Sequence, residues 1–167
     1  YQRSRGLGDV YKRQVADRLK ELLPGTEAKD VDSIGGVDDL TSAEALICCV
    51  PTWNTGADEA RSGTAWDDLV QEIPDQDFAG KPVAILGLGD SSGYSDFFCD
   101  AMEELHSAFV SAGAKVIGKT ATDGYTYDDS KSVIDGKFCG LPLDEDNESE
   151  LTDQRLNAWI TQIQSEA

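Results

Sequence analysis

Two polar loops carry the residues whose types and spacing could do chemistry. The first, PTWNTG at residues 51–56, and the second, GLGDSSGYSD at residues 87–96, each follow a continuous apolar run. An aromatic ring in such a loop either folds back onto the core or forms a flat wall for a planar ligand. Trp53 and Tyr94, one from each loop, could therefore enclose a planar ring system, or could simply pack on their own loops.

The backbone of both loops suits close contact with a ligand. Asn54, Thr55 and Gly56 can form a tight turn whose peptide groups face the ligand, and Gly56 eases changes in backbone conformation. The glycines of the second loop let backbone N–H groups approach a ligand. The second loop is not a dinucleotide-binding fingerprint, because Gly-x-Gly-x-x-Gly would require glycine where Ser92 stands.

The sequence predicts that strands alternate with helices and that the two loops follow two of the strands. Apolar runs and periodicity predict strands at residues 26–31, 45–50, 82–86, 115–118 and 138–143, and helices at residues 15–23, 38–44, 66–73, 98–113 and 156–163. This alternation predicts an α/β sandwich around a parallel sheet. Ligands of such sheets bind at the carboxyl ends of the strands, where the two loops begin.

Composition excludes several classes of protein. The 167 residues suit one domain, and 14 basic against 32 acidic residues give a net charge of −18. So acidic a chain repels nucleic acids and anionic membranes, and no apolar run is long enough to span a bilayer. One histidine, His106, and four cysteines without a Cys-x-x-Cys pair make a metal site improbable and indicate a reducing compartment. We expect Cys48 and Cys49 to pack in a strand, and Cys99 and Cys139 to be more exposed.

The first fourteen residues differ from the rest. Tyr1–Gln14 is basic in an otherwise acidic chain, and residues 9–14 back-translate to a sequence that resembles a transposon-end adapter. We therefore expect residues 1–14 to be a non-native segment and residues 15–167 to form a single, N-terminally truncated domain. The acidic run at residues 144–150 is expected to be a solvated face, and Trp66 and Trp159 are expected in the core.

Three segments resemble flavodoxins in order and spacing. They are PTWNTGADEARSGTAWDDL, GLGDSSGYSDFFCDAMEELH and DGKFCGLPLDEDNESELTDQRLNAW, and the first is most similar to algal and cyanobacterial members. The polar excursion at residues 120–137 resembles the insertion of the long-chain class. The resemblance implies a five-stranded parallel sheet of order 2-1-3-4-5 with helices on both faces. The first strand and the phosphate loop would be missing or substituted, which predicts weak binding of the cofactor.

The resemblance also implies a flavin site. Trp53 and Tyr94 would cover the two faces of the isoalloxazine ring of FMN. The Asn54–Thr55 peptide, beside Gly56, would turn its carbonyl toward N5–H of the semiquinone. The remaining implied contacts are the backbones that hold the pyrimidine edge (Asp90, Phe97 and Cys99) and the residues that line the site (Thr52, Gly87, Leu88 and Gly89).

By the same resemblance, the protein would be a low-potential one-electron carrier rather than an enzyme. Non-covalently bound FMN would shuttle between semiquinone and hydroquinone, with no catalytic residue and no metal. The implied partners are ferredoxin–NADP reductase, photosystem I or similar proteins with basic docking faces. The carrier would be a monomer in the cytoplasm, or in the plastid stroma of an alga.

Two other functions suit a similar fold. An FMN-dependent NAD(P)H or quinone reductase would need room for a substrate over the flavin, which aromatic rings on both faces would occupy. A signalling receiver domain would need a phospho-accepting aspartate after the strand at residues 45–50, and Pro51 follows that strand.

Overall fold

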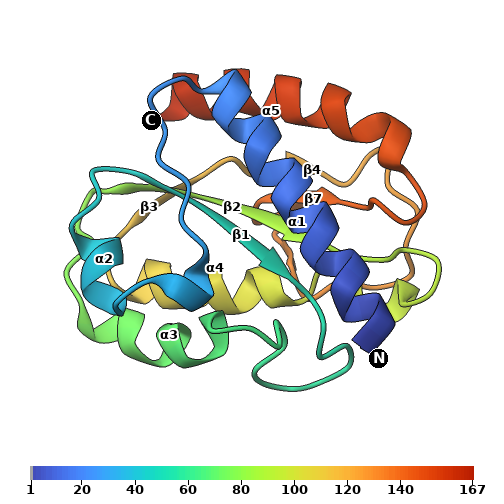
Figure 1. Ribbon diagram of the computed structural model, residues 1–167, viewed down its shortest axis with the longest axis horizontal. Coiled ribbons are helices and arrows are strands. Elements are labelled where there is room, and N and C mark those ends of the chain that lie inside the picture. The colour runs from blue at the N-terminus through green and yellow to red at the C-terminus, as the bar shows by residue number, and fades with distance from the viewer. Residues whose placement is uncertain (1) are drawn as a thin grey trace.

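A parallel sheet with helices on both faces organises the chain, as Figure 1 shows. The computed structural model describes residues 2–167, with side chains from residue 10 onward. The α-helices are α1 (Gln2–Leu22), α2 (Val37–Thr41), α3 (Trp66–Glu72), α4 (Ala101–Ser111) and α5 (Thr152–Glu166). The strands are β1 (Leu46–Pro51), β2 (Pro82–Leu88), β3 (Lys115–Ile117), β4 (Thr120–Ala121), β5 (Val133–Ile134), β6 (Lys137–Phe138) and β7 (Leu141–Leu143). Short 3-10 helices lie at Val31–Ser33, Ile73–Asp75, Ser95–Phe97 and Ser149–Leu151.

Strand β2 lies at the centre of the main sheet. Its one edge pairs in parallel with β1, from Leu46 opposite Val83 to Pro51 opposite Leu88. Its other edge pairs first with β3 and then with β7, so two short strands share one position in the sheet. The chain between them forms a small antiparallel sheet of order β4-β6-β5. The carboxyl ends of β1 and β2 thus lie side by side, which brings the two polar loops to the same edge.

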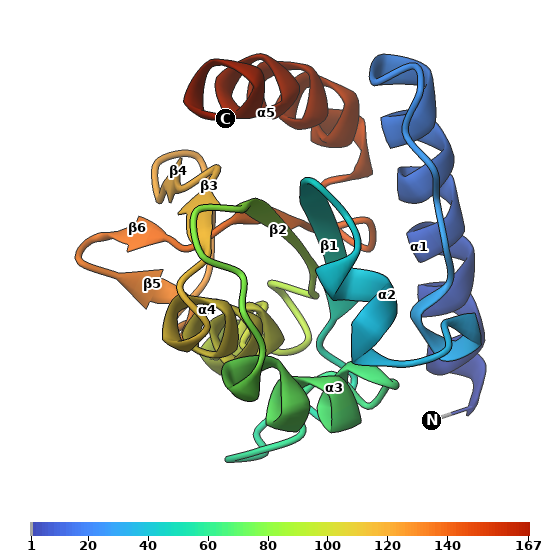
Figure 2. The ribbon, with the colours of Figure 1, turned by 90° about the vertical axis from the view of Figure 1, so that its left-hand side faces the viewer.

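Alternate side chains of β2 build two separate cores. Val83 and Ile85 face α3 and α4, whereas Ala84 and Leu86 face α1 and α5, and all four are essentially inaccessible to solvent. This alternation follows from the two-residue repeat of a strand. Figure 2 shows α5 on one side of the sheet and α3 and α4 on the other. Both faces are covered, and the continuous apolar runs of the strands are explained by this burial.

The predicted α/β architecture is confirmed, but two predicted strands differ from the structure. Residues 138–143, expected as one strand, are divided between β6, which ends at Phe138, and β7, which begins at Leu141. Residues 26–30 are irregular, and Val31–Ser33 forms a 3-10 helix. In the expected sheet of order 2-1-3-4-5, the numbers count strands along a flavodoxin chain, so the second strand lies at the edge and pairs only with the first. Among the described residues, no strand pairs with the outer edge of β1, and α1 packs beside that strand instead. The segment at 26–31 therefore has no ladder to join.

The boundaries of several helices differ from the prediction, since α2 ends at Thr41 and α5 extends from Thr152 to Glu166. The predicted stripe of α1 is confirmed by Val15 and Leu19, both buried, but the helix already begins at Gln2. Helix α4 begins at Ala101 rather than at residue 98, because Cys99 has a φ of +52° that an α-helix cannot include. Phe98 is nevertheless fully buried, which explains its place in the apolar periodicity.

Candidate functional site

The two polar loops start next to each other because of the register of β1 and β2. Pro51 lies opposite Leu88, and the N–H of Thr52 continues the ladder by donating to the Leu88 carbonyl at 3.2 Å. The Thr52 hydroxyl accepts a hydrogen bond of 3.1 Å from the N–H of Ala101, the first residue of α4. The first loop is thereby joined to the helix that follows the second loop.

The tips of the two loops also touch. Gly56 has a φ of +81°, and a Cβ at this position would lie 3.6 Å from the ring of Phe97. A side chain at residue 56 would be strained by this φ, although its Cβ would make only an ordinary van der Waals contact with the ring. Glycine here lets the turn of the first loop lie against an aromatic ring of the second.

The first loop folds back on itself after the turn. The N–H of Asn54 donates to the Arg61 carbonyl at 3.0 Å, and its side-chain Nδ2 donates to the Ala60 carbonyl at 2.6 Å. The N–H of Trp53 donates to the Ser62 carbonyl at 3.2 Å. We call residues 60–62 the return arm of the loop. The position of the Asn54 turn therefore depends on where the return arm is held.

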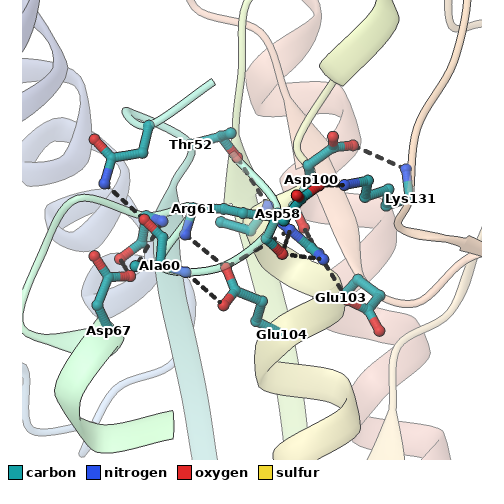
Figure 3. Close-up of polar contacts among 12 residues, drawn as sticks. Thr52, Asp58, Ala60, Arg61, Asp67, Asp100, Glu103, Glu104 and Lys131 are labelled. Atoms are coloured by element: carbon teal, nitrogen blue, oxygen red, sulfur yellow. Dashed lines mark hydrogen bonds and ion pairs between the residues drawn. The ribbon is translucent and has the colours of Figure 1, made fainter. Parts of the chain in front are cut away.

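Charged side chains hold the return arm against α4 and α3 (Figure 3). The carboxylate of Glu104 accepts hydrogen bonds from the N–H groups of Ala60 and Arg61, at 3.0 and 2.7 Å. The carboxylate of Asp67, in the first turn of α3, accepts from the N–H and hydroxyl of Ser62, at 3.2 and 2.6 Å. These bonds fix the return arm at both of its ends.

The guanidinium of Arg61 adds a second tie. It donates to the Glu103 carboxylate at 2.7 Å, to the Asp100 carbonyl at 3.2 Å and twice to the Asp58 carbonyl. Burial alone would raise the pKa of Glu103, but hydrogen bonds from Ser107 and Arg61 and the positive charge of Arg61 outweigh it, and the pKa is lowered. Glu103 is therefore held in its charged form beside Arg61.

The second loop is shaped by two aspartates. Asp90 Oδ1 accepts from the N–H groups of Ser92 and Gly93, at 3.0 and 2.7 Å, which makes a tight turn just before Tyr94. Asp144 is fully buried, and its carboxylate accepts hydrogen bonds from the N–H and the hydroxyl of Ser91. The interpretation of residues 144–150 as a solvated face is thus wrong at its first residue, because Asp144 turns inward to anchor the loop.

Aromatic surface is exposed where the loops meet. Tyr94 is 54% exposed and Phe97 38%, and both are among the few large apolar side chains that lie open in the described part of the chain. The ring of Trp53 is half-buried, and Lys12 of α1 places its Nζ 5.8 Å from the ring centroid. A planar, largely apolar ligand would cover these rings, and an anionic group beside Trp53 would meet the charge of Lys12.

Comparison with known proteins decides the family. The sequence model of the family described as Flavodoxin matches residues 11–159. The flavodoxin of Nostoc sp. strain PCC 7120 is 47% identical over 170 residues, which cover 98% of each chain. The chain belongs to the flavodoxin family.

Other flavodoxins agree with this assignment. Flavodoxin 1 of Azotobacter vinelandii is 38% identical over 92% of this chain and 88% of its own. A solved structure of Fusobacterium nucleatum flavodoxin bound to flavin mononucleotide superposes with a TM-score of 0.83 at 35% identity, and covers 92% of this chain and 89% of that one. The resemblance predicted from the three sequence segments is confirmed, including its cyanobacterial character.

The structure places the remaining predicted flavodoxin site residues at the base of the loops. Gly87 and Leu88 end β2, where a Cβ on Gly87 would overlap the Met102 side chain. A Cβ on Gly89 would lie 2.7 Å from the sulfur of Cys99. These glycines therefore let the chain before α4 pack tightly against the end of β2.

Two expectations about cysteines are corrected. Cys99 and Cys139, expected to be more exposed, are 0% and 1% exposed. Burial raises the pKa of the Cys99 thiol well above its usual value, and it raises that of Cys139 to about 12. Both cysteines are packing residues. The predicted core positions of Trp66 and Trp159 are confirmed, and Trp66 donates from Nε1 to the Cys49 carbonyl at 3.0 Å.

Sequence reasoning missed the residues that hold the loops, namely Arg61, Glu104 and Asp144. Arg61 carries a signal, because it is the only lysine or arginine between Lys29 and Lys81 in this acidic chain. Glu104 and Asp144 carry none, since each lies among other acidic residues and binds a loop that is 43 or more positions away in the sequence.

Proposed function

We propose that this flavodoxin carries single electrons on non-covalently bound FMN, held by the loops after β1 and β2. The observation that supports this best is the exposed aromatic surface of Tyr94 and Phe97 on the second loop, where Phe97 lies against the turn at Gly56. Exposed rings at the carboxyl edge of a parallel sheet are the expected place for a planar ligand. The solved relative from Fusobacterium nucleatum is bound to the same cofactor.

The residues present fit the flavin ring better than they fit the phosphate. Trp53 and Tyr94 offer planar surfaces, and the tight packing at Gly87 and Gly89 leaves backbone groups of the second loop at the edge of the sheet. Helix α1 runs without interruption through residues 2–22, so the described residues before Val15 form a helix rather than a phosphate-binding loop. We therefore propose that the ring supplies most of the affinity for FMN.

FMN supplies reversible one-electron chemistry when bound, and the protein sets its energetics. Aromatic cover from Trp53 and Tyr94 and a chain of net charge −18 would disfavour negative charge on a bound flavin ring and so would lower its reduction potential. The Asn54–Thr55 peptide, next to Gly56 with its φ of +81°, would present its carbonyl toward N5 of the ring. The working couple would thus lie between the one-electron-reduced and the two-electron-reduced forms, and no residue acts as acid, base or nucleophile.

The acidic surface indicates the kind of partner. A net charge of −18 steers association with basic protein faces and raises the rate of encounter at low salt. Among residues 2–167, no helix has the length and apolar character needed to cross a bilayer. We propose a carrier that meets proteins such as ferredoxin–NADP reductase and photosystem I through basic docking sites, as a monomer in the cytoplasm or in a plastid stroma.

A binding and reduction experiment tests the proposal. FMN is titrated into the purified chain while flavin fluorescence is followed, and the complex is then reduced stepwise with one-electron dyes of known potential. We expect quenching on binding, two separate one-electron steps, and no oxidation of NADPH unless ferredoxin–NADP reductase is added. Unquenched flavin, or one two-electron step, would refute the carrier. NADPH oxidation by the complex alone would favour the reductase alternative.

A further inference from the structure

We propose that Arg61 and Glu104 are positioning residues for the flavin site. They hold the turn at Asn54–Gly56 in one conformation, and this conformation sets the first one-electron potential of bound FMN. The proposal rests on the proposed function, since it concerns the turn that would face N5 of the flavin. We call Arg61, Glu103 and Glu104 together the clamp. None of them is expected to touch the cofactor.

The first step of the argument concerns the shape of the return arm. Ala60 has a φ of +53°, a conformation that residues with a Cβ rarely adopt. The N–H groups of Ala60 and Arg61 both point to the single carboxylate of Glu104, which is 15% exposed. A partly buried charge that accepts two successive N–H groups stabilises this unfavourable backbone. Without the charge, the return arm loses the partner that selects its conformation.

The second step connects the return arm to the turn. Asn54 bonds to the carbonyls of Ala60 and Arg61, through its side chain and its N–H respectively. The peptide groups of Ala60 and Arg61 therefore connect Glu104 on one side to Asn54 on the other. A shift of the return arm moves the Asn54–Thr55 peptide directly, without any change in the strands.

The third step shows that the clamp is tied to the rigid part of the molecule. Arg61 is 11% exposed and bridges its own loop, at the Asp58 carbonyl, to α4 at Glu103 and to the Asp100 carbonyl. Asp100 is itself buried and accepts from the N–H of Lys131 at 2.8 Å. Figure 3 shows these side chains converging between the loop and the first turns of α4. The clamp thus fixes the position of the return arm, and with it the turn, relative to α4.

The test compares Glu104→Gln and Arg61→Lys with a matched control. Glutamine keeps the size of Glu104 but offers one acceptor oxygen to two N–H groups, and lysine keeps the charge of Arg61 without its fork. Glu148→Gln is the control, because Glu148 forms a similarly half-buried pair with Arg155 at 3.3 Å, against the neighbouring helix α5. Each variant weakens one partly buried charged contact, and only Glu104→Gln and Arg61→Lys weaken it at the loop.

The first readout needs no cofactor. Hydrogen exchange of the Asn54 and Ala57 amides should become about tenfold faster or more in Glu104→Gln and Arg61→Lys, in line with the loss of a hydrogen bond to a charged group. The amide of Ile85 in β2 should be unchanged, and Glu148→Gln should leave all three amides as they are. Unchanged exchange at Asn54 would overturn the clamp whatever the chain binds.

The second readout uses the FMN complex. If the turn is held about tenfold less well, the first one-electron potential should fall by about 59 mV, the value of a tenfold change for one electron. Faster exchange with an unaltered potential would overturn the positioning role and leave a structural one. A wild-type chain that binds no FMN would overturn the proposed function and the flavin part of this inference, while the exchange data would still decide whether the clamp holds the turn.

Discussion

Removal of the Tyr94 ring should weaken FMN binding and leave the fold intact. Tyr94 is 54% exposed and lies on the loop after β2, so the Tyr94→Ala substitution removes few contacts within the protein. Surface substitutions of this kind usually change the free energy of unfolding by less than about 0.5 kcal/mol. The effect on the ligand should be larger, because the ring is proposed to cover one face of the flavin.

The exposed area gives the size of the effect. A fully buried aromatic side chain covers about 150–250 Å², so about 100 Å² of Tyr94 is open to a ligand. A flavin stacked on one face of the ring would cover about half of that, about 50 Å². At about 25 cal/mol per Å² this burial contributes ~1.3 kcal/mol. The Kd of Tyr94→Ala for FMN should therefore rise about tenfold.

Fluorescence titration of FMN measures this change directly. Val110→Ala is the control, because Val110 is 51% exposed in α4 and lies outside both loops, so its Kd should equal that of the wild type. Thermal unfolding of both variants should match the wild type within a few degrees. An unchanged Kd for Tyr94→Ala, or an equal rise in both variants, would refute the stacking role.

Three further predictions concern packing, reactivity and the phosphate. Gly140→Ala should lower the unfolding temperature far more than Gly136→Ala. A Cβ on Gly140 would overlap the Ile85 carbonyl, whereas a Cβ on Gly136 would enter open space and would only be strained by the φ of +81°. The reverse order in thermal unfolding would contradict this. Cys139 is buried and has a pKa of about 12, so at pH 8 it should react with a thiol reagent far more slowly in the native protein than in the unfolded chain, and equal rates would contradict this. FMN and riboflavin should bind with Kd values within a few-fold of each other, since α1 offers no phosphate loop, and a hundredfold preference for FMN would disprove that reasoning.

The elements that position the site could be predicted because their signals are local. Continuous apolar runs before Pro51 and before residue 87 mark strands buried on both faces, and the structure has β1 and β2 there. The rule that ligands bind at carboxyl ends then selects the two loops without further information. The strand expected at residues 26–31 failed for the opposite reason. A strand needs a neighbour to pair with, and the absence of that neighbour cannot be read from the segment itself.

The residues that hold the loops could not be predicted, because their roles arise only in the folded chain. Glu104 looks like any other acid on the surface of a helix until α4 docks beside the return arm. In the sequence, Asp144 is simply the first residue of an acidic run, and only the folded position of β7 places its carboxylate next to Ser91. In both cases a partly or fully buried carboxylate accepts hydrogen bonds from backbone N–H groups of a loop that is distant in the sequence.

This use of acids changes how the net charge should be understood. Asp67, Glu104 and Asp144 each bind N–H groups of the two loops, so part of the acidic excess shapes the site from inside. Partly buried charges of this kind are screened by salt much less than exposed ones. Raising the ionic strength should therefore slow the encounter with a basic partner and leave the Kd for FMN nearly constant. Equal salt sensitivity of both would mean that these carboxylates act as surface charges and not as anchors of the loops.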